Sequence, residues 1–97
     1  RWLDLRARCA AWKIPSSDPA TRTPVRSAVP TLIQAGELDP VTPARWAATV
    51  ARWLDDVEVV VSPRWTHAPS TWNSCAAHLV TRFLDTGDRP AGGSTDC

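Results

Sequence analysis

The 97-residue sequence contains no methionine or tyrosine, only one phenylalanine, two histidines and three cysteines. The cysteines show no C-x-x-C spacing, so we expect no structural zinc site, and nothing in the composition calls for a cofactor. No apolar run approaches the roughly 20 residues of a membrane span. Eleven basic and ten acidic residues are spread along the chain for a net charge of +1. Nucleic acid and membrane surfaces are therefore not expected partners.

The first third of the sequence differs in character from the rest. Trp2, Leu5, Cys9 and Trp12 recur at helical spacing. The residues that follow lose this periodicity and are rich in proline, serine and threonine, which is typical of an irregular connection. We expect residues 1–29 to be a helix and a connection that belong to a preceding region. Because the chain opens within this helix and without methionine, we expect it to be a fragment or processed product.

Residues 30–97 show an alternation of strand and helix patterns. The short apolar run at 31–35 and the β-branched run at 57–61 both predict buried strands. Between them, Thr42 and Pro43 are typical of a helix start, with Thr42 as the predicted cap. A last helix is predicted to begin after Asn73 or Ser74 and to stop at Gly87. The apolar face predicted for it consists of Ala76, Leu79, Val80, Phe83 and Leu84. The tail after it is predicted to be extended.

The order strand, helix, strand, helix predicts an α/β fold with a parallel strand pair. Two parallel strands cannot cover both their faces and their outer edges. We therefore expect an incomplete sheet that the missing part of a larger protein completes, and we do not expect this chain to fold stably alone.

Two polar residues follow the carboxyl ends of these two strands. Asp39 lies after the first strand and His67 after the second. Loops that leave neighbouring parallel strands lie on the same rim of the sheet, so we expect the two side chains to meet. The acid precedes the histidine, as in the Ser…Asp…His order of α/β-hydrolases. A turn-forming aspartate and a solvated histidine are the alternative interpretation. The second histidine, His78, is predicted to be solvated on the polar side of the last helix.

Three segments carry a resemblance to a known family. They are TLIQAGELDPVTPARWAATVARWL, VEVVVSPRWTH and SCAAHLVTRFLDTG, the last followed by a terminal cysteine. Over residues 9–97 the sequence resembles the C-terminal domain of tripeptidyl-aminopeptidase-like α/β-hydrolases, which are mostly secreted or exported serine peptidases. The resemblance implies that Asp39 is the catalytic acid and His67 the catalytic histidine. Thr66 stands where family members usually have glycine.

The cysteines also match this family. The resemblance implies a disulfide between Cys75 and Cys97, which would staple the tail and favour a secreted or extracytoplasmic location. Small buried thiols are the alternative explanation. Cys9 would be left free, or would pair with a cysteine outside this chain.

No G-x-S-x-G motif occurs in the sequence, so the serine nucleophile is expected outside it. We expect the parent protein to be a serine hydrolase, namely an exopeptidase that releases short peptides from N-termini, and this chain alone to be inactive. An esterase on the same fold and a non-catalytic remnant or interaction chain are the alternatives. The expected partners are the nucleophile-bearing part of the same hydrolase and a peptide or ester substrate.

Overall fold

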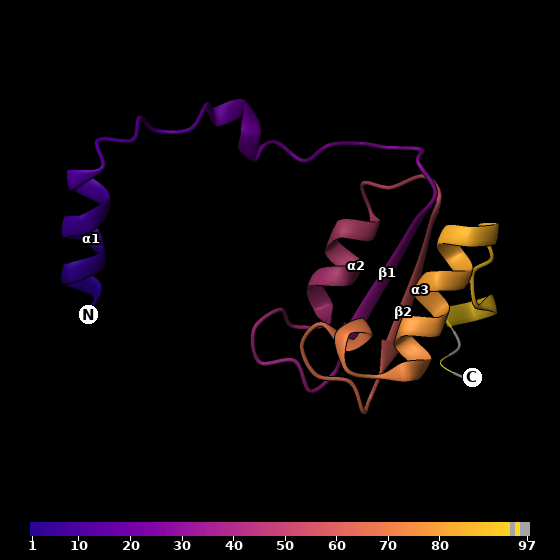
Figure 1. Ribbon diagram of the computed structural model, residues 1–97. Coiled ribbons are helices and arrows are strands. Elements are labelled where there is room, and N and C mark those ends of the chain that lie inside the picture. Colours follow the sequence, from indigo (N-terminus) through magenta and orange to yellow (C-terminus); the bar gives the residue numbers. More distant parts are fainter. Residues whose placement is uncertain (94, 96–97) are drawn as a thin grey trace.

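The computed structural model of the protein describes residues 1–93 and residue 95. Over these residues, three α-helices and two strands follow one another as α1 (Trp2–Ala11), β1 (Thr31–Gly36), α2 (Arg45–Ala51), β2 (Val57–Ser62) and α3 (Ser74–Thr86). Short 3₁₀ turns lie at η1 (Pro19–Arg22), η2 (Pro69–Thr71) and η3 (Ala91–Gly93). Figure 1 shows α1 standing apart from a body in which the strands lie between α2 and α3.

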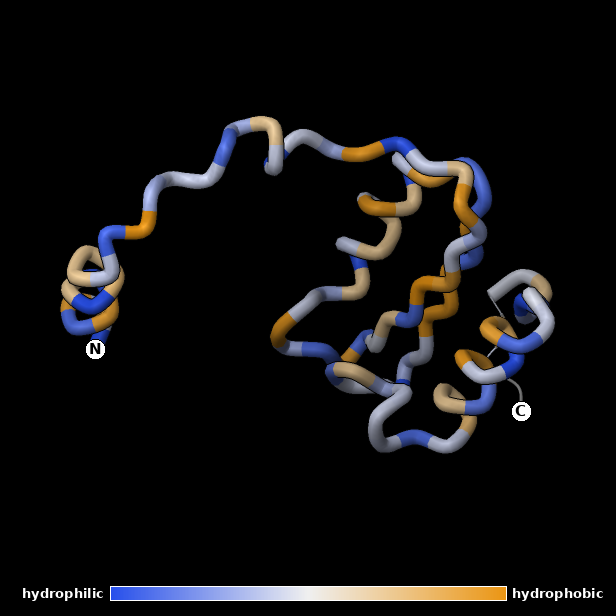
Figure 2. The backbone as a smooth tube through the Cα atoms, turned by 45° about the horizontal axis from the view of Figure 1, so that its top comes forward, coloured by the Kyte–Doolittle hydropathy of each residue, from blue (hydrophilic) through white to orange (hydrophobic). Residues whose placement is uncertain are grey.

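The two strands form the predicted parallel pair. Their register runs from Thr31 opposite Val57 to Gly36 opposite Ser62. Figure 2 shows hydrophobic stretches, drawn in orange, where the chain of these two strands runs between the helices. Among the described residues each strand pairs only with the other, so each keeps one edge free of a neighbouring strand. This agrees with the incomplete α/β sheet expected from the sequence.

The main core lies between the strands and α3. Val60, Trp65, Ala76 and Leu79 are buried together, and Leu32 and Cys75 are partly buried against them. On the opposite side of the pair, Ala35 of β1 and Ala47 of α2 are buried. The strands thus form the middle layer of a small α/β body, and burial of their β-branched residues explains why they are strands.

The last helix begins and ends where the sequence predicts. The Asn73 side chain accepts a hydrogen bond from Ala76 N–H at 2.9 Å, which satisfies one of the free amides of the first turn. Gly87 ends α3 in the left-handed conformation, with φ of 74°. The prediction that the apolar face of α3 includes Leu84 is wrong, because Leu84 is 74% exposed.

Two further local predictions are wrong. Thr42 does not cap a helix, since α2 begins at Arg45 with Ala44 before it and without a side-chain cap. The tail is not simply extended, because it contains the turn η3, in which Gly93 lies directly against the Val59 carbonyl of β2. A Cβ on Gly93 would come within 2.6 Å of that oxygen, so glycine at this position lets the tail lie this close to β2.

The N-terminal segment contributes nothing to the core. Each of residues 1–26 is exposed, and α1 buries none of its residues. The segment joins the body at Ser27, which forms an isolated bridge with Leu54, just before β1 begins. The expected division into residues 1–29 and 30–97 stays a prediction. Within the described part of the chain, no helix is both long and apolar enough to cross a bilayer.

Candidate acid–histidine site

Two loops at the carboxyl ends of the strands are joined backbone to backbone. The acid loop follows Gly36 and the histidine loop follows Ser62. Glu37 N–H donates to the Ser62 carbonyl at 3.0 Å, and Leu38 N–H donates to the Trp65 carbonyl at 3.1 Å. The pairing of β1 with β2 therefore continues beyond the strands, and it fixes how the two loops face each other.

Gly36 makes this close approach possible. A Cβ built on Gly36 would lie 2.1 Å from the Trp65 carbonyl oxygen and 2.9 Å from the Thr66 carbonyl oxygen. Any side chain would therefore push the histidine loop away. Trp65 anchors the other side of the contact, because this residue is only 3% exposed and belongs to the core.

The structure brings Asp39 and His67 together. Oδ2 of Asp39 lies 3.0 Å from Nδ1 of His67, although 28 positions separate the residues in the sequence. The contact expected from the two loops is therefore present. The Asp39 side chain is 5% exposed and that of His67 is 51% exposed, so a shielded carboxylate holds a ring that solvent or a partner can reach.

The acid loop holds the carboxylate of Asp39 through both oxygens. Oδ1 accepts hydrogen bonds from the N–H groups of Val41 at 2.8 Å and Thr42 at 3.0 Å, and Oδ2 accepts one from the Thr42 hydroxyl at 2.6 Å. Burial alone would raise the pKa of Asp39. The hydrogen bonds from Thr42, Val41 and His67 outweigh it and hold that pKa well below its usual range. Asp39 is therefore a carboxylate at neutral pH.

The histidine is held by its own loop as well as by the acid. The indole Nε1–H of Trp72 donates to the His67 carbonyl at 3.0 Å. The left-handed residue of this loop is Ala68, with φ of 49°, and Thr66 has a negative φ. Threonine at position 66 therefore needs no glycine-like backbone in this loop.

This arrangement can orient an imidazole for proton transfer. With Nδ1 facing the carboxylate, Nε2 is the ring nitrogen left to face a nucleophile, as in a serine-hydrolase triad. Sequence reasoning identified both residues of the pair, but it missed Thr42 and Trp72 as their supports. The signal for Thr42 was the aspartate shortly before it in a proline-rich loop, since Asp side chains often bond the backbone of the residues that follow them.

The other residues singled out from the sequence lie away from this pair. His78 is exposed on α3, as predicted. Cys9 is an exposed free cysteine on α1. The Sγ atom of Cys75 lies 3.2 Å from the carbonyl oxygen of Thr95. Cys97 lies outside the described residues, so the Cys75–Cys97 disulfide stays a prediction.

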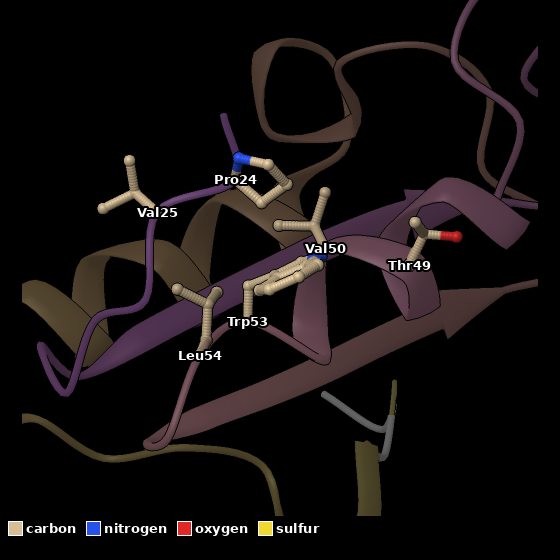
Figure 3. Close-up of a pocket in the computed structure, with 6 residues that line it drawn as sticks. All are labelled: Pro24, Val25, Thr49, Val50, Trp53 and Leu54. Carbon is tan, nitrogen blue, oxygen red and sulfur yellow. The ribbon is translucent and has the colours of Figure 1, made fainter. Parts of the chain in front are cut away.

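An apolar pocket of about 300 Å³ lies between residues 24–25 ahead of β1, α2 and the turn that follows α2 (Figure 3). Its lining residues are Pro24, Val25, Thr49, Val50, Trp53 and Leu54. None of them is titratable or belongs to the acid or histidine loop, so the pocket supplies no group for proton transfer. In the part of the chain that the structure describes, no three His, Cys, Asp or Glu side chains gather as a metal site would require.

A comparison with known protein families identifies the family of this chain. A family model described as TAP-like protein, one of the α/β-hydrolase families, matches residues 1–97. No curated protein and no solved structure gives a significant match. Since the family model covers the whole sequence, the chain belongs to the tripeptidyl-aminopeptidase-like family of α/β-hydrolases.

Proposed function

We propose that this chain supplies the acid and the histidine of a Ser–His–Asp triad, with Asp39 and His67 in these roles. The 3.0 Å contact between Asp39 Oδ2 and His67 Nδ1 carries the proposal. The depressed pKa of Asp39 supports it, because the acid of a triad must stay ionised while it orients the imidazole and stabilises the imidazolium.

In this mechanism, His67 acts through Nε2. The ring takes the proton of a serine hydroxyl as the serine attacks the substrate carbonyl, and it then gives that proton to the leaving amine. The resulting acyl-enzyme is hydrolysed when the same ring activates water. Asp39 keeps Nδ1 protonated and stays a carboxylate throughout. The half-exposed ring of His67 leaves room for the serine and the substrate on this side.

The nucleophile must come from residues outside these 97, because the sequence holds no G-x-S-x-G motif. We propose that the nucleophile-bearing part of the same hydrolase pairs with a free edge of the β1–β2 sheet. Such pairing would complete the sheet and bring the serine to the rim where both loops lie. The 97-residue chain alone then has no hydrolase activity.

We propose that the substrate of the parent protein is a peptide, and that the enzyme is an exopeptidase that releases short peptides from N-termini. Family membership supports this choice, since fold and triad alone do not decide the substrate. We also propose a secreted or extracytoplasmic location, which the predicted Cys75–Cys97 disulfide supports.

The test uses the full-length protein that carries this chain. His67→Ala should remove nearly all turnover, and Asp39→Asn should lower kcat on the order of 10⁴-fold, as in serine proteases. His78→Ala and Asp85→Asn are matched controls, because both residues are exposed on α3. These two variants should keep wild-type kcat.

Two series of substrates separate the possible activities. Hydrolysis of tripeptide anilides well above that of short acyl esters would support the exopeptidase, and the reverse preference would indicate an esterase. If folded His67→Ala protein kept most of its activity, the site assignment would be wrong. If the wild-type protein hydrolysed neither series, a non-catalytic chain would be the better explanation.

A further inference from the structure

We infer that the Thr42 hydroxyl is a positioning group for the Asp39–His67 pair, an inference that rests on the proposed function. Its oxygen, Oγ1, lies 2.6 Å from Asp39 Oδ2 and 3.3 Å from His67 Nδ1. Since Nδ1 lies 3.0 Å from the same Oδ2, these three atoms form a closed triangle. The hydroxyl thus touches the one bond on which the orientation of the imidazole depends.

The single hydroxyl hydrogen decides how the triangle is bonded. Ionised Asp39 can only accept hydrogen bonds, so at 2.6 Å the hydroxyl of Thr42 donates to Oδ2. If Nδ1 of His67 carried no hydrogen, it would face Asp39 Oδ2 and Thr42 Oγ1, and neither oxygen would have a hydrogen left to donate to it. A protonated Nδ1 donates to Oδ2 instead. The hydroxyl therefore favours the tautomer with hydrogen on Nδ1, which leaves the lone pair of Nε2 for the nucleophile.

The hydroxyl acts on the carboxylate oxygen that the histidine contacts. The amides of Val41 and Thr42 hold Oδ1 of Asp39, so the side chain stays anchored when the hydroxyl is removed. Only Oδ2 would then lose a donor and gain freedom to turn away from His67. Removal should therefore disturb catalysis more than folding.

The experiment compares Thr42→Val with Thr42→Ser in the full-length protein. Valine keeps the shape but lacks the hydroxyl, whereas serine keeps the hydroxyl. Thr42→Val should lower kcat about 10- to 100-fold, which is the size of one hydrogen bond to a charged group. KM should stay within about threefold, because the hydroxyl contacts the pair and not the substrate. Thr42→Ser should restore kcat to within about threefold of wild type.

Thr81→Val is the matched control, because the exposed Thr81 hydroxyl on α3 donates only to the Ala77 carbonyl of its own helix. Its kcat should equal that of the wild type. The inference is overturned if Thr42→Val keeps wild-type kcat, or if Thr42→Ser loses as much as Thr42→Val. The His67→Ala variant separates the two proposals. If His67→Ala loses activity while Thr42→Val keeps it, only the positioning role of Thr42 is refuted. Activity kept in His67→Ala refutes the proposed function itself.

Discussion

Replacement of Gly36 by alanine should displace the histidine loop from the acid loop. The added Cβ would lie 2.1 Å from the Trp65 carbonyl oxygen, 2.4 Å from its carbon and 2.9 Å from the Thr66 carbonyl oxygen. All three atoms belong to backbone, which cannot rotate aside as the end of a side chain can. Ordinary van der Waals contact begins at 3.4 Å, so the loop must retreat by about 1 Å.

The size of the effect follows from the bonds that cross this gap. The hydrogen bonds from Glu37 to Ser62 and from Leu38 to Trp65 would stretch, at a cost of about 1 kcal/mol each. Overpacking adds about 1–3 kcal/mol. We expect Gly36→Ala to lower the free energy of unfolding by about 3–5 kcal/mol. A shift of about 1 Å between Asp39 and His67 should also lower kcat about 10²-fold.

Urea denaturation and turnover of a tripeptide anilide by the full-length protein measure the two effects. Gly87→Ala is the control, because Gly87 has a φ of 74° but no atom within 4 Å of an added Cβ. It should cost about 1–2 kcal/mol through backbone strain alone and leave kcat unchanged. Wild-type kcat in Gly36→Ala, or an equal loss of kcat in Gly87→Ala, would refute the reasoning.

Three further predictions concern pH, the cysteines and the isolated chain. The pKa of Asp39 lies below its unfolded value near 3.9, so its contribution to stability is complete above that pH and is lost as the pH falls further. In the Asp39→Asn variant, the urea midpoint should therefore fall less steeply than in the wild type as the pH drops below about 4. An equally steep fall in both proteins would contradict this. Mass spectrometry of non-reduced digests should show Cys75 joined to Cys97, a bridge worth roughly 3 kcal/mol, and alkylation of both thiols under oxidising conditions would contradict it. The 97-residue chain alone should not react with a fluorophosphonate probe, and stoichiometric labelling would show that it contains an activated nucleophile.

The local signals of the sequence predicted the elements well, because each depends on neighbouring residues. The β-branched run at 57–61 predicted β2, and Asn73 and Gly87 predicted both ends of α3. The order of strands and helices predicted the parallel pair, and with it the meeting of Asp39 and His67 at one rim. The family resemblance was likewise confirmed by the match over residues 1–97.

Tertiary structure decided how the pair is held. Local pattern favours Thr42 as a helix cap, yet α2 begins only at Arg45, and the Thr42 hydroxyl donates to the Asp39 carboxylate instead. Nothing near Gly36 in the sequence indicates that it faces the Trp65 carbonyl, about 30 positions away. These contacts depend on the register of two strands joined by a helix. Spacing along the sequence can place two loops on one rim, but only the packed backbone determines which atoms meet there.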